Sequence, residues 1–176
     1  FDKLRWLNNH YLKQTADSEL ARLVEPRLEG SGVRLAEQPA GSAADLAVVC
    51  GLLKERAQTI NELADLAHMF YGEHDPQAIA PADRDKHLTA AAREALAGLA
   101  QRLAALAPGD WTAAGISAAL KETLAAHGLK MPQLAVPVRL LVFGAAQTPS
   151  VDAMLAAMPK AAVLARLARW PASGDA

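Results

Sequence analysis

Residues that could ligate a metal ion lie close together near the middle of the chain. Glu73, His74 and Asp75 are adjacent, and His68 lies nearby in the sequence. Adjacent residues in a loop seldom converge on one ion, and ligands paired at helical spacing are missing here. We therefore interpret this cluster as a solvated loop, and we predict no metal site.

Two other patterns bear on catalytic or nucleotide chemistry. The segment Gly30-Ser-Gly-Val-Arg-Leu35 begins like a dinucleotide-binding loop, but it lacks the third glycine and a preceding strand, so we interpret it as the end of a helix. The acidic residues show no pair whose spacing and apolar setting would separate two pKa values for acid–base catalysis. The sequence predicts no catalytic residue and no cofactor site within this chain.

The first 72 residues have the spacing of a helical subdomain. A helix is expected near the amino end, and a second over Leu20 to Leu28 that ends at Gly30. Ser42 is expected to cap a third helix, and the capping box Thr59-Ile-Asn-Glu62 begins a fourth. Two helices therefore meet around Arg56.

The segment from Glu73 to Pro81 contains two prolines and several charges, and it predicts a boundary between subdomains 1–72 and 73–176. One long helix is expected after Pro81, and another between Thr112 and Gly128. The residues from Met131 to Gly144 alternate like a strand, yet Pro137 also suits the first turn of a helix, so periodicity leaves both open. Thr148 is expected to cap a further helix that Pro149 opens. Pro159 is expected to open the last helix.

Composition favours an all-α protein. Hydrophobic residues make up 52% of the 176 residues and aromatic residues 5%, with alanine and leucine dominant, which suits helices better than sheets. Cys50, the single cysteine, lies in an apolar run and is expected in the core. With no run of membrane-spanning length and no signal-peptide pattern, we expect a cytoplasmic protein. Because the chain begins at Phe1, we expect it to be part of a longer protein.

The net charge of −1 does not indicate a nucleic-acid-binding protein, but the charge is unevenly distributed. The segment from Asp110 to Trp170 contains three acidic residues and six basic ones: Lys121, Lys130, Arg139, Lys160, Arg166 and Arg169. This excess permits a polyanion on one face. Charge alone favours solvated helix faces.

Four stretches resemble bacterial glutamyl-tRNA synthetases. The opening Lys3-Leu-Arg-Trp-Leu-Asn-Asn-His-Tyr11 resembles a pattern that follows the catalytic half of those enzymes. Agreement in order and spacing extends to three further segments: Leu53-Lys-Glu-Arg-Ala-Gln-Thr-Ile-Asn-Glu-Leu63, Gly128-Leu-Lys-Met131 with Pro137-Val-Arg-Leu140, and Gly144-Ala-Ala-Gln-Thr-Pro149. The resemblance covers essentially the whole chain.

The resemblance implies an all-helical anticodon-binding region of two packed subdomains, with 1–72 contacting the tRNA stem and part of the anticodon, and 73–176 completing the anticodon site. It favours a helix for Met131 to Gly144. It also implies anticodon-binding roles for Arg56, Arg139, Thr148, Pro149 and Val151. The family's nucleotide-binding signatures are missing from this sequence, so ATP and Mg²⁺ are expected only in the full-length enzyme.

The chemistry of Arg56 agrees with that role. Glutamate and glutamine anticodons differ at the third base, cytosine against guanine. A guanidinium group offers only donors, which match the two adjacent acceptors of an unpaired cytosine but oppose a guanine donor. Pro149 and Val151 can add apolar contacts to splayed bases. On sequence alone, Arg56 is more simply a solvated surface residue, and its family position reverses that preference.

The expected partner is tRNA(Glu), and we expect a monomer. A helical protein-interaction or scaffold domain that does not bind RNA suits the same composition and is the main alternative. A related class I lysyl enzyme is a third possibility, although the arginine-containing motifs fit the glutamyl pattern better. For Trp6 and Tyr11, packing in the core or between domains is favoured over stacking on RNA.

Overall fold

The regular elements of the chain are helices throughout the part that the structure describes. The computed structural model describes residues 2–39 and 41–170, with the side chains of residues 2–6 excepted. The chain divides into two compact units, 1–73 with 157–159 and 74–156 with 160–176. No helix in the described ranges is both long and apolar enough to cross a membrane. The all-α prediction is confirmed.

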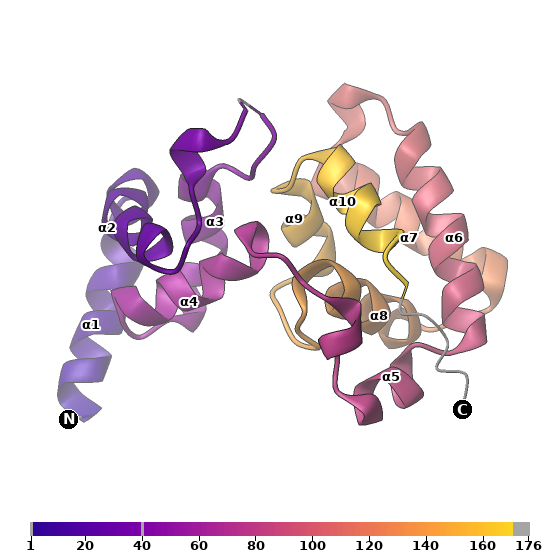
Figure 1. Ribbon diagram of the computed structural model, residues 1–176, viewed down its shortest axis with the longest axis horizontal. Helices are drawn as coiled ribbons and strands as arrows, with labels where there is room; N and C mark the ends of the chain where they lie inside the picture. Colours follow the sequence, from indigo (N-terminus) through magenta and orange to yellow (C-terminus); the bar gives the residue numbers. More distant parts are fainter. Residues whose placement is uncertain (1, 40, 171–176) are drawn as a thin grey trace. The chain divides into compact units, whose positions relative to one another are not determined.

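The first unit is built on four helices: α1 (Asp2–Gln14), α2 (Asp17–Gly30), α3 (Leu46–Leu53) and α4 (Ile60–Tyr71). Short 3₁₀ helices, η1 (Leu35–Glu37) and η2 (Lys54–Arg56), precede and follow α3. Helix α2 packs against both α3 and α4, as Figure 1 shows. Its contribution to the core is a stripe at helical spacing, Leu20, Val24 and Leu28, which is fully buried.

Helix α3 begins at a different cap from the expected one. Ser42 donates its hydroxyl to the Pro39 carbonyl instead, and the Oδ1 atom of Asp45 accepts the backbone N–H groups of Ala47 and Val48. Asp45 lies directly before the first helical residue, where a carboxylate satisfies otherwise unpaired N–H groups. The expected cap of α4 is confirmed, since the Thr59 hydroxyl accepts the Glu62 N–H at 3.1 Å.

The second unit contains η3 (Pro76–Ala78), α5 (Pro81–His87), α6 (Ala90–Ala105), η4 (Pro108–Asp110), α7 (Ala113–His127), α8 (Met131–Phe143), α9 (Val151–Ala156) and α10 (Lys160–Leu167). Helix α6 packs against α7, α8 and α10. The prediction of a single long helix after Pro81 is wrong. Helix α5 ends before Leu88, and Thr89 caps α6, because its hydroxyl oxygen accepts the Ala92 N–H. A threonine hydroxyl at this position stabilises a new helix start.

Helix α8 settles the segment that periodicity left open. It contains eight buried residues, and its neighbours are α5, α6, α7, α9 and α10. A helix covered on most faces carries apolar residues on most faces, so its sequence can alternate like a strand. Pro137 lies in the helix interior, not in the first turn, which contains Pro132.

Candidate functional site

Arg56 is the last residue of η2, between α3 and α4. Leu53 before η2 and Ala57 after it are both fully buried. The backbone is therefore anchored in the core on each side, while the Arg56 side chain is exposed. Arg56 is thus an exposed residue at the end of a short 3₁₀ segment that lies between two buried residues.

Lys54, at the start of η2, is fixed to the beginning of α2. Its Nζ atom lies 2.7 Å from Oδ1 of Asp17 and 3.4 Å from the Thr15 carbonyl oxygen. The side chain of Lys54 is 20% exposed and that of Asp17 is 45% exposed. Sequence reasoning did not identify this pair, because its partners are 37 residues apart and no local pattern connects them.

The other candidate residues lie in the second unit, and three of them form a connected group. Nε of Arg139 on α8 donates to Oγ1 of Thr148 at 3.0 Å, and the Thr148 hydroxyl donates to the Pro149 carbonyl at 2.8 Å. Thr148 is 7% exposed, whereas Arg139 and Pro149 are half-buried. The arginine thus holds the loop that leads to α9.

The start of α9 differs from the expectation that Thr148 caps it. The helix begins at Val151, and the Met154 N–H donates to the Ser150 carbonyl. The Thr148 hydroxyl is directed to Pro149 and Arg139 instead. The Val151 side chain is only 5% exposed, so it anchors the first turn of α9 in the core, and Pro149 is the more accessible apolar group.

Gly144 joins α8 to this loop in the left-handed conformation. Its φ is 67° and its ψ is 16°, and its N–H donates to the Leu140 carbonyl. A Cβ atom added at Gly144 would lie 2.8 Å from Nδ1 of His74. Glycine is required here for both its backbone freedom and its small size.

Arg166 on α10 stabilises the same end of α8. Its Nη1 atom donates to the Val142 carbonyl at 2.6 Å. Burial, with a smaller contribution from Arg169, lowers the pKa of Arg166 below its usual range. A positive charge at a helix carboxyl end is favourable, so Arg166 supports the helix that carries Arg139.

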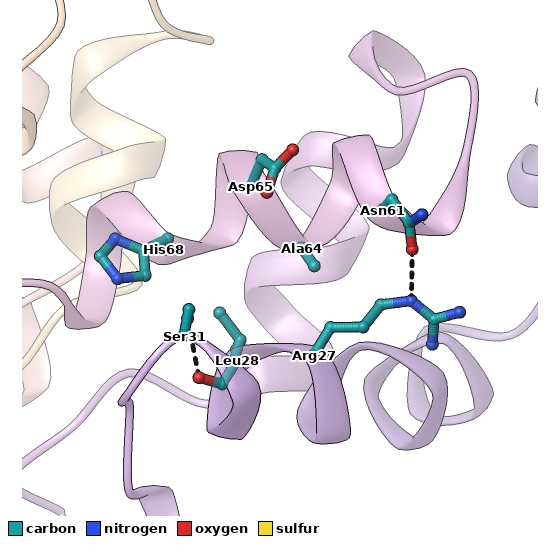
Figure 2. A pocket seen from close by; sticks show the side chains of 7 residues that line it. All are labelled: Arg27, Leu28, Ser31, Asn61, Ala64, Asp65 and His68. Carbon is teal, nitrogen blue, oxygen red and sulfur yellow. Dashed lines mark hydrogen bonds between the residues drawn. The ribbon is translucent and has the colours of Figure 1, made fainter.

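A polar cavity lies between α2 and α4 in the first unit. Its volume is about 610 Å³, and Figure 2 shows Nε of Arg27 bonded to Oδ1 of Asn61 at 2.6 Å. Asp65 and His68 line the same cavity. The cavity contains side chains of both charges, and it contains none of the predicted anticodon-binding residues.

The potential metal ligands are used in other ways or lie apart. Oδ1 of Asp75 accepts the Gln77 N–H and caps η3, while His68 belongs to α4. Among residues 2–39 and 41–170, leaving out the side chains of residues 2–6, no group of three histidine, cysteine or acidic residues could hold a metal ion.

Tyr11 is not a core residue, because 59% of it is exposed. Packing in the core is therefore wrong for Tyr11, and packing between domains stays a prediction. Trp6 has its side chain outside the described residues. Cys50 is fully buried as expected, and burial together with Asp17 and Asp45 raises the pKa of its thiol to about 12.

Comparison with known proteins gives consistent relatives. The family model for an anticodon binding domain matches residues 19–171. Glutamate–tRNA ligases from Bordetella petrii and Thiobacillus denitrificans are each 51% identical to the chain over 94% of its length. The chain spans about a third of the length of these relatives, 33% in both cases.

Solved structures share the fold. A glutamate tRNA ligase from Elizabethkingia meningosepticum matches 94% of this chain with a TM-score of 0.78 and 20% identity, over 31% of its own length. A glutamate-tRNA synthetase from Elizabethkingia anophelis matches 96% with a TM-score of 0.74, also over 31% of its length. From the family match and the shared helical fold, we conclude that the chain belongs to the anticodon-binding domain family.

Proposed function

We propose that this chain is the part of a glutamate–tRNA ligase that reads the anticodon of tRNA(Glu). The observation that carries this proposal is 51% identity with curated glutamate–tRNA ligases over 94% of the chain. Sequence identity at that level supports a shared choice of tRNA more strongly than a shared fold does, because one fold can carry many functions. The helical fold alone would suit an RNA-free interaction domain equally well.

In the first unit, Arg56 reads the third anticodon base. Support comes from its exposure at the end of η2, between buried Leu53 and Ala57. The guanidinium group donates to the two acceptors on the pairing edge of cytosine, and a guanine there would oppose donor with donor. The wrong base leaves polar groups unpaired, which costs free energy of binding.

In the second unit, Arg139 and the segment from Thr148 to Val151 contact other anticodon nucleotides. Arg139 supplies charge, and its bond to Thr148 orders the loop. Pro149 offers a half-buried ring against which a splayed base can pack. Val151 acts through its buried side chain, which fixes where that loop ends.

The whole protein joins glutamate to tRNA(Glu) with ATP and Mg²⁺, acts in the cytoplasm and is a monomer. The described residues of this chain do not fit ATP or the metal, because they contain no suitable ligand group and the sequence carries no phosphate-binding signature. We assign both to the two thirds of the relatives' length that lie outside this chain.

Binding of the chain to anticodon stem-loops tests the proposal. The tRNA(Glu) stem-loop is compared with a copy in which guanine replaces the third anticodon base, at several salt concentrations. Replacing Arg56 with Gln removes the donor-only fork and should lower the discrimination by about 1–3 kcal/mol. Replacement of Arg22 with Gln is the matched control, because Arg22 is an exposed arginine of α2 whose side chain is 81% exposed.

We expect the unaltered chain and R22Q to prefer the cytosine stem-loop, and R56Q to lose that preference. Affinity should fall with salt in all three, since phosphate contacts contribute. Equal binding of the unaltered chain to both stem-loops and to an unrelated one would show attraction to polyanions only, and it would reject anticodon reading.

A further inference from the structure

The 3₁₀ helix η2 is attached to the amino end of the chain at three of the four positions from 54 to 57. Lys54 bonds to Asp17 and the Thr15 carbonyl, as described above. Glu55 pairs with Lys13 of α1 at 2.8 Å between Oε2 and Nζ. Helix α1 lies against η2 along this contact.

The third attachment bonds the backbone directly after Arg56. Nδ2 of Asn9 on α1 donates to the Ala57 carbonyl at 2.7 Å, across 48 positions of sequence. Ala57 is fully buried, so its carbonyl has limited access to water. Removal of the amide would leave that acceptor without this bond, which is more costly than loss of an exposed contact.

These attachments differ in strength. The Lys13–Glu55 pair is 41% and 63% exposed, and exposed ion pairs contribute little. The Lys54–Asp17 pair has a lysine side chain that is 20% exposed and a second bond to a backbone carbonyl. The Asn9 bond is part-buried. Asn9, Asp17 and Lys54 therefore supply most of the restraint.

A restraint of this kind matters because η2 is only three residues long. A single 3₁₀ turn has little stability of its own, so its backbone direction is set by what holds it. A bidentate contact with one base tolerates displacement of only a fraction of an ångström. The backbone direction at Arg56 thus depends on its neighbours in sequence being fixed from both sides.

We propose that Asn9, Asp17 and Lys54 form a clamp that positions Arg56, and so determine selectivity at the third anticodon base without contacting it. This inference rests on the proposed role of Arg56. The clamp joins α1 and the start of α2 to the reading residue. It changes the choice between bases more than it changes overall affinity.

Two clamp variants of the chain test this independently, Lys54→Met and Asn9→Ala. Lys54→Arg is the conservative variant, because an arginine can still pair with Asp17. Arg22→Met is the matched control, since it removes one positive charge from α2 and leaves η2 untouched. Dissociation constants are measured for three stem-loops: that of tRNA(Glu), one altered at the third anticodon base and one altered at the first.

The third-base ratio should fall roughly fivefold or more in both clamp variants, the range expected when one base contact is lost. It should be retained in Lys54→Arg and Arg22→Met. The first-base ratio should not change in any of them, because the second unit is unaltered. Melting temperatures are recorded for each variant.

Three results would overturn the clamp. Unchanged third-base ratios in both clamp variants, with a lowered ratio in Arg56→Gln, would reject the clamp and leave the proposed function intact. A parallel fall in both ratios with the melting temperature would show a structural role only. An unchanged third-base ratio in Arg56→Gln itself would reject the proposed role of Arg56, and the clamp with it.

Discussion

The Cys50 thiol is fully buried in the first unit, and the half-buried Tyr71 hydroxyl lies near it. Burial raises the pKa of Cys50 to about 12 and raises that of Tyr71 as well, with smaller contributions from Asp45 to both. The Tyr71 hydroxyl also donates to the Ala44 carbonyl at 3.0 Å. The folded chain therefore keeps both groups protonated at pH values where the unfolded chain ionises them.

This difference predicts that the chain loses stability at alkaline pH. The unfolded state releases the Cys50 proton from about pH 9, while the folded state holds it, so the free energy of unfolding decreases as pH rises above that value. The slope for one group is at most about 1.4 kcal/mol per pH unit. Urea unfolding at pH 8 and pH 10 measures it, and Cys50→Ala should reduce the loss. An equal loss in that variant would contradict this origin.

For single residues, the sequence predicted candidate side chains but not the contacts that hold them. Only the structure shows that Thr148 and Pro149 lie beside Arg139. A hydrogen bond joins Arg139 to Thr148. Asn9, Asp17 and Lys54 were missed, because their contacts span 37 to 48 positions. Long-range polar pairs have no local periodicity, and a sequence pattern cannot register them.

At the scale of elements, Gly144 is the joint between α8 and the loop that carries Thr148. We expect Gly144→Ala to destabilise the chain by about 1–3 kcal/mol, because φ is 67° and the new methyl group meets the His74 ring. Unfolding by urea measures the loss. Gly109→Ala is the matched control, since nothing lies within 4 Å of a Cβ atom there.

The double variant Gly144→Ala with His74→Ala separates the two causes. It removes the ring from the methyl group but leaves the backbone in the left-handed region, so stability should recover only in part when compared with His74→Ala alone. Full recovery would mean that the backbone conformation contributes nothing. No recovery would mean that the ring contact is irrelevant.

Local signals predicted helix interiors well and helix boundaries less well. The Thr59 cap was confirmed, and of the two expected candidates Asp110 and Thr112 the structure uses Thr112, because capping chemistry acts within a few residues. The apolar spacing of α2 was confirmed at Leu20, Val24 and Leu28 but not at Leu23, which is exposed. The break at Thr89 was missed, since the apolar spacing continues through Leu88 and only the hydroxyl bond marks a new start. Helix α8 was ambiguous because it packs against five other helices, and these contacts cannot be recognised from the periodicity of its own sequence.

The chain spans about a third of the length of the relatives that it matches. We expect no ATP–pyrophosphate exchange from this chain with glutamate, because its sequence lacks a nucleotide-binding signature. The full-length Bordetella petrii ligase, assayed at equal concentration, is the positive control. Exchange above background by the purified chain would place catalytic residues where neither sequence nor structure indicates them.

The clamp between α1 and η2 has a thermodynamic consequence. If the position of α1 determines how well Arg56 meets its base, linkage requires that occupancy of Arg56 stabilises α1 in that position by the same free energy. Hydrogen exchange of the backbone N–H groups in the last turns of α1 should therefore slow when the cytosine stem-loop binds, more than with the guanine copy at equal saturation. Equal protection by both would show that α1 does not respond to the third base. A difference would make α1 a sensor of which anticodon has been bound.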